Sequence, residues 1–311
     1  MSVLNRFGTL IALIVIIAVF AAASPGGFAQ IGNLVNITQQ MSLLAIVAIG
    51  ATLVMVLGEF DLSVSAMVSW GGIVAVTLFQ AGVGTVPVFA IVLLSCLVIG
   101  SGSGVLVARF RVPSFIATLA MGTILGGLTF WLSDGATLFG GMPDGFRDLA
   151  RGTALGLPVL TWWMIAAGLL VWLVLDRVEY GRRLYAVGGN REAALLAGVP
   201  VRRDSVLAFA LCAAFAGLVG LLLTARLGSA HPTGGGGFLL QAYAAVFLGM
   251  TAFKNGEPNV PGTLVGAAII AVIANGLTIL GVPAFLQDVL TGAIIIAAVL
   301  LRRAAGRKSR E

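Results

Sequence analysis

The sequence predicts an all-α polytopic membrane protein with about ten transmembrane helices, and three observations lead to this prediction. Hydrophobic residues make up 59% of the 311-residue chain and charged residues only 10%, so polar side chains cannot cover a globule in water. The apolar residues stand in long runs and do not alternate with polar ones, which favours helices over the strands of a membrane barrel. The 42 glycines suit closely packed membrane helices. We expect a single transmembrane domain over residues 1–311.

We expect ten apolar runs to cross the membrane, taking roughly 20 residues per crossing as a guide. The first run ends in three alanines that could mimic the cleavage site of a signal peptide, but we expect it to be retained as an anchor. The runs cover residues 9–23, 41–58, 62–80, 87–108, 114–132, 159–176, 205–224, 239–253, 262–280 and 285–301.

The basic residues divide unevenly between the two sides that ten crossings define. With the N-terminus inside, fifteen fall on the inner side and three on the outer side, so the positive-inside rule predicts that both termini are cytoplasmic. The net charge of +6 therefore reflects topology and does not indicate nucleic-acid binding. The inner set comprises Arg6, Arg109, Arg111, Arg177, Arg182, Arg183, Arg191, Arg202, Arg203, Lys254 and, in a basic tail over 302–311, Arg302, Arg303, Arg307, Lys308 and Arg310; the outer set comprises Arg147, Arg151 and Arg226.

A polar break at residues 58–63 separates the second and third apolar runs. Its carboxylates, Glu59 and Asp61, are costly at membrane depth unless water, a partner or a substrate compensates. One interpretation is a tight cytoplasmic turn in which Asp61 or Ser63 caps the next helix. The other is a broken helix whose polar backbone lines a transport path, as in other transporters. The candidate substrate path comprises Glu59, Asp61, Ser63, Ser114 and Thr118.

Three further loops follow. A basic cytoplasmic turn at 109–113 ends in proline, and Ser114 can cap the run after it. The longest outer loop, 133–158, can carry a short helix on the surface. The loop at 225–238 contains four consecutive glycines and is expected to be flexible; its His231 is either a polar loop residue or a gate contact. The candidate gate or binding-protein loop comprises Arg226, His231 and Thr233.

The segment 184–204 differs from its apolar surroundings because it carries helix signals at both ends. Asn190 is a good N-cap, and Glu192 in the first turn suits the helix dipole. Gly198 and Pro200 end the helix. The resulting helix, 191–197, is roughly 10 Å long and too short to be stable alone in water. It is either a surface turn between two membrane helices or a docking helix for a protein on one side of the membrane.

The sequence lacks the motifs of several chemistries. It has no phosphate-binding Gly-x-x-x-x-Gly-Lys-Ser/Thr loop and no hydrolase or metalloprotease motif. One histidine and two separated cysteines, Cys96 and Cys212, do not make a metal or haem site, and both thiols lie in apolar runs. We expect no catalytic residue, no metal and no cofactor, so the energy for any transport comes from another chain.

Ordered motifs along nearly the whole chain resemble the permeases of ribose-type, simple-sugar ABC importers. The stretch 192–198 resembles the Glu-Ala-Ala loop of ABC importer permeases in general. Other matching stretches are 58–64, 113–119, 181–190, 226–230, 262–267 and 275–277. The chain differs from the family pattern at Glu59, where a small residue is usual, at Met250 and Lys254, and in the run of four glycines at 234–237.

This resemblance implies an inner-membrane subunit that works with partners. They are a second permease copy, identical or related, an ABC ATPase subunit and an extracytoplasmic solute-binding protein that delivers a monosaccharide or related polyol. Within a coupling loop at 181–203, the resemblance assigns 190–198 as the coupling helix that enters a cleft of the ATPase. Alternatives are a permease for branched-chain amino acids or nucleosides, and a stand-alone secondary carrier. The candidate ATPase-coupling residues are Asn190, Arg191, Glu192, Ala193, Ala194 and Gly198.

Overall fold

The computed structural model of the chain is almost entirely helical. It describes residues 3–250, 252–253, 256–283, 285–287, 289–290 and 292–293, with side chains from residue 8 onward. Lys254, Asp288 and the basic tail at 302–311 lie outside the described residues, as does much of the expected tenth run, 285–301.

Six of the described helices are long and apolar enough to cross a membrane, which confirms a multi-pass, all-α membrane protein. Three further apolar helices are shorter, counting only the part of α1 from Gly8 to Ala23. The six are α2 (Ile31–Val56), α4 (Thr85–Ala108), α5 (Ser114–Ser133), α7 (Val159–Arg177), α10 (Val201–Leu227) and α12 (Val260–Ile279). The shorter ones are α1 (Val3–Ala23), α3 (Val64–Gln80) and α11 (Phe238–Gly249).

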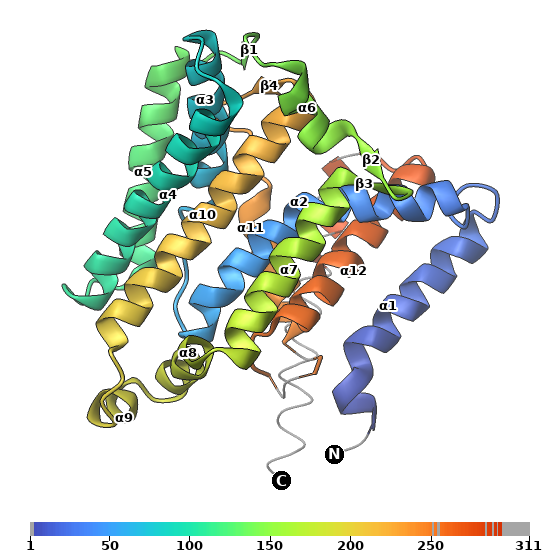
Figure 1. Cartoon of the computed structure of the whole chain (residues 1–311). Helices are drawn as coiled ribbons and strands as arrows, with labels where there is room; N and C mark the ends of the chain where they lie inside the picture. The colour runs from blue at the N-terminus through green and yellow to red at the C-terminus, as the bar shows by residue number, and fades with distance from the viewer. Residues whose placement is uncertain are drawn as a thin grey trace.

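The small elements gather at two opposite ends of the bundle (Figure 1). Helices α8 and α9 form one end, called here the α9 end, and the strands β1 and β4 with helix α6 form the other, called the β4 end. Helix α6 is the short helix expected in the loop 133–158. Strand β1 pairs antiparallel with β4, and β2 with β3. The bounds are α6 (Asp144–Arg151), α8 (Glu179–Gly189), α9 (Arg191–Leu196), β1 (Leu138–Phe139), β2 (Thr153–Ala154), β3 (Leu157–Pro158) and β4 (Ser229–Ala230).

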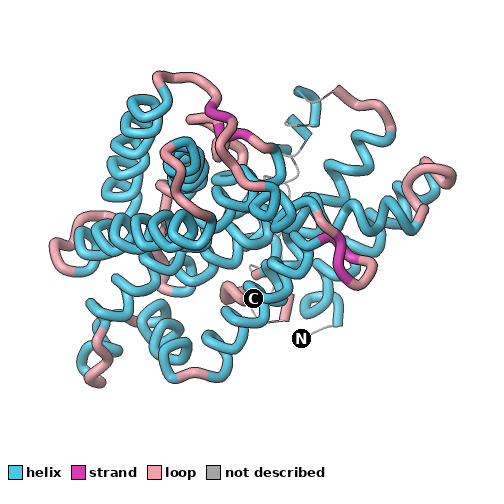
Figure 2. Tube along the Cα trace, turned by 45° about the horizontal axis from the view of Figure 1, so that its top comes forward, coloured by secondary structure: helices cyan, strands magenta, loops and turns pink. Residues whose placement is uncertain are grey.

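Helix α10 is the centre of the packing. It runs diagonally from the α9 end to the β4 end and packs against α2, α3 and α4 (Figures 1 and 2). Glycine permits the close approach between backbones, because a Cβ at Gly220 would overlap the carbonyl oxygen of Val68 in α3. The buried cysteines, Cys96 and Cys212, are free thiols inside this core, as their apolar neighbours predicted.

The predicted start of the second crossing, residue 41, is wrong, because α2 already begins at Ile31. The polar residues that interrupt the apolar pattern are paired across the bundle. Asn33 and Asn275 in α12 exchange two amide hydrogen bonds of 2.9 and 3.0 Å, and the hydroxyls of Thr38 and Thr161 lie 3.0 Å apart. A helix can carry such residues within a membrane when neighbouring helices satisfy them.

Two crossings are interrupted. The 17 residues of α3 reach about 26 Å and the 12 residues of α11 about 18 Å, against roughly 30 Å of hydrocarbon. Non-helical chain precedes each of them, at 57–63 before α3 and at 231–237 before α11. Figure 1 shows the first segment rising from the α9 end of α2 into the body of the bundle before α3 begins. Irregular backbone at this depth is tolerated only where protein or a water-filled cavity surrounds it.

Candidate functional site

Helix α9 forms as its sequence predicts. The side-chain oxygen of Asn190 accepts a hydrogen bond of 2.9 Å from the backbone N–H of Ala193. Glu192 lies in the first turn. Gly198 follows the last turn with a φ of +81°, in the left-handed region that suits glycine. The helix spans Arg191–Leu196, one residue shorter than expected.

The outer face of α9 is not covered by the part of the chain that the structure describes. Only Ala194 is buried, whereas Glu192 and Ala193 are exposed. Leu195 is 60% exposed and Leu196 is 90% exposed. Two exposed leucines on a short helix at the end of the bundle make a small apolar surface that a partner protein could cover.

Helix α8 is held against α10 by a cluster of polar side chains that we did not predict from the sequence. Arg183 makes a two-point ion pair with the buried carboxylate of Asp204, with N···O distances of 2.7 and 3.2 Å. Hydrogen bonds to Asp204 and to Glu179 raise the pKa of Arg183. The hydroxyl of Tyr180 donates to the backbone carbonyl of Asp204 at 3.1 Å, and burial raises the pKa of this tyrosine. Helix α8 is therefore held against α10 and forms a base from which α9 begins.

Two contacts join this base to the polar break before α3. A Cβ at Gly188 would overlap the carbonyl oxygen of Val56, so α8 lies directly against the end of α2. The guanidinium of Arg191 pairs with the carboxylate of Glu59 at 3.5 Å, and both side chains are partly exposed. The structure thus brings together one candidate coupling residue and one candidate path residue that lie far apart in the sequence.

The break is buried at Asp61 and Ser63, and side chains satisfy its backbone. The Asp61 carboxylate is fully buried and accepts hydrogen bonds from the N–H and the hydroxyl of Ser63 through Oδ1. Its Oδ2 has no hydrogen-bond partner among the described residues. The Tyr243 hydroxyl of α11 lies 2.6 Å from the Asp61 nitrogen and 3.0 Å from its carbonyl oxygen. The segment is therefore non-helical chain between α2 and α3, and the lining of a transport path stays a prediction.

The start of α5 supplies the remaining hydrogen-bond acceptors for the break. The backbone N–H of Phe60 donates to the Ser114 hydroxyl at 3.3 Å, and that of Leu62 donates to the Thr118 hydroxyl at 2.9 Å. The expected helix-capping roles are wrong: Pro113 is the N-cap of α5, and Ser63, the N-cap of α3, makes no side-chain capping bond. The hydroxyls of Ser114 and Thr118 instead replace the helical partners that chain 57–63 lacks.

The second break packs against the start of α3. The backbone N–H of Gly235 donates to the Ser69 hydroxyl at 3.0 Å, and a Cβ at Gly235 would overlap the carbonyl oxygen of Ser65. The four glycines thus permit a close approach, which corrects the expectation of an unconstrained loop. Both interrupted crossings meet at the first turns of α3. Asp61 precedes these turns in the sequence, and Gly235 packs against them.

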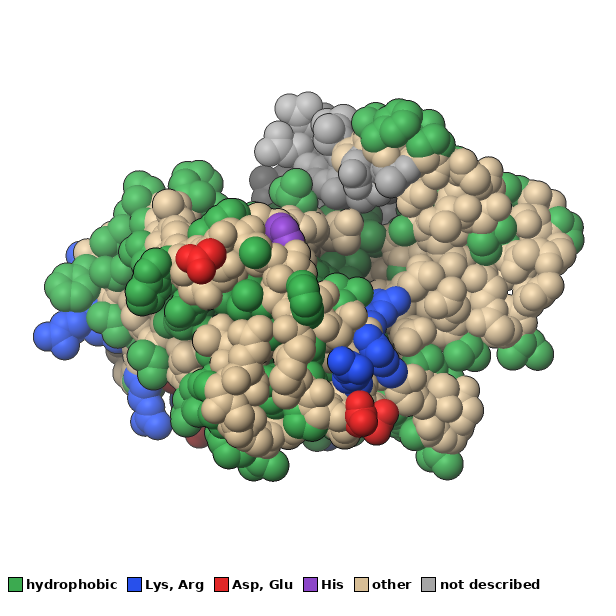
Figure 3. All heavy atoms as spheres, turned by 90° about the horizontal axis from the view of Figure 1, so that it is seen from above, with side chains coloured by type: hydrophobic (Ala, Val, Ile, Leu, Met, Phe, Trp, Pro, Cys, Tyr) green, Lys and Arg blue, Asp and Glu red, His purple; other side chains and the backbone are tan. Residues whose placement is uncertain are grey.

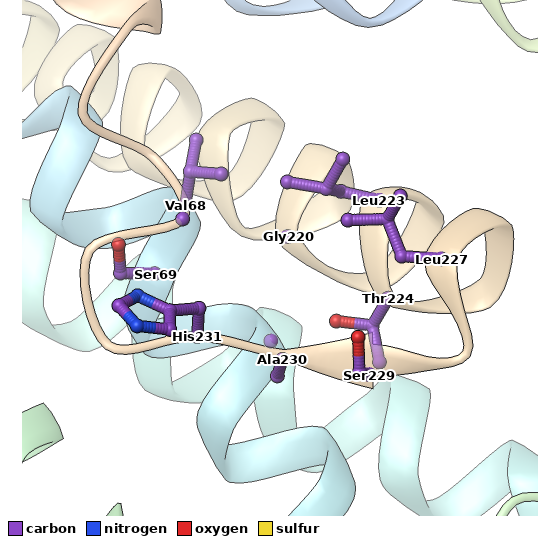
Figure 4. A pocket seen from close by; sticks show the side chains of 11 residues that line it. Val68, Ser69, Gly220, Leu223, Thr224, Leu227, Ser229, Ala230 and His231 are labelled. Atoms are coloured by element: carbon purple, nitrogen blue, oxygen red, sulfur yellow. The ribbon is translucent and has the colours of Figure 1, made fainter. Parts of the chain in front are cut away.

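The three candidate gate residues lie at the β4 end. The carbonyl of Arg226 accepts a hydrogen bond of 2.8 Å from Arg151. The ring nitrogen Nδ1 of His231 lies 2.8 Å from the Thr233 hydroxyl. His231 also borders a small pocket between α3 and α10 that includes Ser69 (Figure 4). Figure 3 looks onto this end, where the single histidine is purple and a group of blue basic side chains lies beside a red acidic one.

A many-helix bundle with interrupted crossings and a capped helix presented at one end defines a membrane transport permease. The chain belongs to the family described as the branched-chain amino acid transport system / permease component, whose family model matches residues 33–299.

Similar proteins include sugar permeases over nearly their whole length. The ribose import permease protein RbsC of Escherichia coli K12 is 39% identical over 296 residues, covering 94% of this chain and 92% of that protein. RbsC of Bacillus subtilis 168 is 37% identical, covering 97% and 94%. The D-allose transport system permease protein AlsC of Escherichia coli K12 is 34% identical, covering 96% and 92%. No solved structure matches the chain.

Proposed function

We propose that the chain is the permease subunit of an ABC importer for a monosaccharide or related polyol. A separate ATPase supplies the energy, and an extracytoplasmic binding protein delivers the solute. The observation that carries this proposal is the exposed, capped helix α9, which is tied through Arg191 and Glu59 to the non-helical segment 57–63 before α3. The names of the relatives, which are ribose and allose permeases, supply the solute class.

The proposed topology has ten crossings in one domain over residues 1–311, with both termini cytoplasmic, in the inner membrane. It is supported by six long and three shorter apolar helices, with the tenth run at 285–301. The helix ends and turns at the α9 end, together with α8 and α9, also carry most of the described arginines. Two copies, identical or related, would enclose the path between them.

The proposed mechanism begins at the outer face of α9. Asn190, Glu192, Ala193, Ala194 and Gly198 shape the helix that enters the ATPase, and Arg191 links it inward. Closure of the ATPases on ATP would push α9 toward the bundle. Because α8 rests on the end of α2 and Arg191 pairs with Glu59, the push would reach chain 57–63.

The displaced chain 57–63 would open the solute path. The free Oδ2 of Asp61 could then accept a hydrogen bond from a sugar hydroxyl. Ser63, Ser114 and Thr118 would supply further hydroxyls on the same side. Arg226, His231 and Thr233, at the β4 end, would meet the binding protein.

The test reverses the charge on the exposed face of α9. Glu192→Arg should abolish uptake and binding of the ATPase. A positive charge at a helix N-terminus is unfavourable with the helix dipole, and the substitution also reverses the charge that α9 presents to the ATPase. Glu192→Asp keeps the charge and should retain most uptake. Insertion into the membrane should be normal in both variants, measured by protein level in isolated membranes. Normal uptake by Glu192→Arg would count against the proposal.

A branched-chain amino acid is the second candidate solute, because the family description names that transport class. Uptake into vesicles that contain the full transporter separates the two candidates. Ribose or allose should compete with the transported solute, and leucine should not. Competition by leucine alone would move the assignment to the amino acid class.

A further inference from the structure

A groove between α4 and α10 at the α9 end has no role in the transport path proposed above. It is open on one side and has a volume of about 470 Å³, within the range of sites that hold small ligands. Helix α4 contributes its last two turns and α10 its first three. The lining residues are Ser101, Val105, Ala108, Arg109, Arg202, Arg203, Val206, Leu207 and Ala210.

The lining changes from charged to apolar along the groove. Arg109 follows the last residue of α4, and Arg202 and Arg203 stand in the first turn of α10. Ser101 and Ala210 lie about 12 Å further along their helices, at 1.5 Å per residue. Both helices are long and apolar enough to cross the membrane. The charged end therefore lies at the membrane surface, while the apolar end extends into the hydrocarbon.

The three arginines at the mouth of the groove lack acidic partners in the described part of the chain. No ion pair joins any of them to a carboxylate there, and no acidic residue lines the groove. Asp204, the nearest acid in sequence, is engaged by Arg183. Like charges held together repel one another unless an anion compensates. Guanidinium groups bind phosphate well because they can donate two parallel hydrogen bonds.

We propose that this groove binds an anionic phospholipid, with the phosphate at the three arginines and an acyl chain along the apolar walls. A phospholipid matches both ends of the groove, because it joins a phosphate to hydrocarbon. Basic pockets between membrane helices on the cytoplasmic side recognise acidic head groups in this way. A soluble phosphate would leave the apolar end unfilled, and a soluble protein could not reach it.

The experiment measures phospholipid retained by the purified transporter complex in detergent, by native mass spectrometry. Phosphatidylglycerol and phosphatidylcholine with identical acyl chains are titrated separately. We expect phosphatidylglycerol to remain bound and the zwitterionic lipid to be displaced. The triple variant Arg109→Gln, Arg202→Gln, Arg203→Gln should weaken phosphatidylglycerol binding by more than about tenfold.

The matched control removes three other arginines expected on the same side of the membrane. The variant Arg111→Gln, Arg177→Gln, Arg182→Gln changes the net charge equally but leaves the groove intact. It should bind phosphatidylglycerol as the wild type does. Equal weakening in the two triple variants would show a general effect of surface charge and would overturn the proposal.

Two further arms separate the lipid from other partners. Ser101→Phe narrows the apolar end and keeps all three arginines, so it should also weaken lipid binding. Glycerol 3-phosphate, which lacks acyl chains, should not compete; effective competition would assign the groove to a soluble phosphate. Unchanged lipid binding together with loss of the ATPase from the arginine variant would assign these arginines to the ATPase.

The triple variant can be replaced by a single one if it does not fold. Arg109→Gln alone changes an exposed side chain, and its lipid binding is then compared with that of Arg111→Gln.

Discussion

The ion pair between Glu59 and Arg191 is the residue-scale link between α9 and the non-helical segment 57–63. Its energy is small, below about 1 kcal/mol for a partly exposed pair, so its loss should affect coupling more than folding. We predict that Glu59→Arg or Arg191→Glu alone lowers uptake per ATP hydrolysed, because like charges then face each other at 3.5 Å. The double exchange should restore much of the loss, measured as uptake and hydrolysis in the same proteoliposomes.

The control for this exchange is Arg182, an exposed arginine of α8. Combining Arg182→Glu with Glu59→Arg should give no restoration. If the double exchange at 59 and 191 is as impaired as the single variants, the pair does not transmit motion.

Local rules predict residues whose role is set by their sequence neighbours. Asn190 and Gly198 could be assigned as helix start and stop because capping depends on a few adjacent residues. The Arg191–Glu59 pair could not be found in this way, because 132 positions separate its members. Arg183 and Asp204 are only 21 positions apart, but their pairing depends on how α8 folds back onto α10. Tyr243 was missed because its hydroxyl meets Asp61 only through packing of the two interrupted crossings.

At the scale of elements, the proposed mechanism requires α8 to stay against the end of α2. We predict that Gly188→Val separates them, because the new side chain would overlap the Val56 carbonyl. The variant should lose uptake and show a lower melting temperature in detergent. Gly189→Val is the matched control, since no atom lies within 4 Å of a Cβ built there. Equal effects of the two substitutions would mean that helix propensity, and not the contact, is responsible.

The sequence predicts apolar helices well and interruptions less well. The helices α4, α5, α7 and α12 start and end close to the predicted limits because polar turns and prolines bound them. The start of α2 was misplaced because hydropathy does not register that Asn33 and Thr38 have partners on other helices. The two breaks were visible as an acidic motif and a glycine run. The two breaks meet at α3 because of tertiary packing, which neither motif predicts.

At the scale of the whole molecule, the proposed topology places α9 inside the cell and the β2–β3 turn outside. Leu196 is 90% exposed on α9, and Leu155 is 91% exposed in that turn. We predict that Leu196→Cys reacts with a membrane-impermeant maleimide only in inside-out vesicles, and Leu155→Cys only in right-side-out vesicles. The native Cys96 and Cys212 give little background because both are buried. The reverse labelling pattern would invert the topology.

The most direct measurement compares solute uptake by proteoliposomes that contain this chain alone with uptake by those that also contain its ATPase and binding protein. The account predicts that accumulation of a sugar requires all three components and ATP, and that the chain alone neither accumulates solute nor hydrolyses ATP. Accumulation by the chain alone on an ion gradient would contradict it, because the energy would then enter without passing through α9.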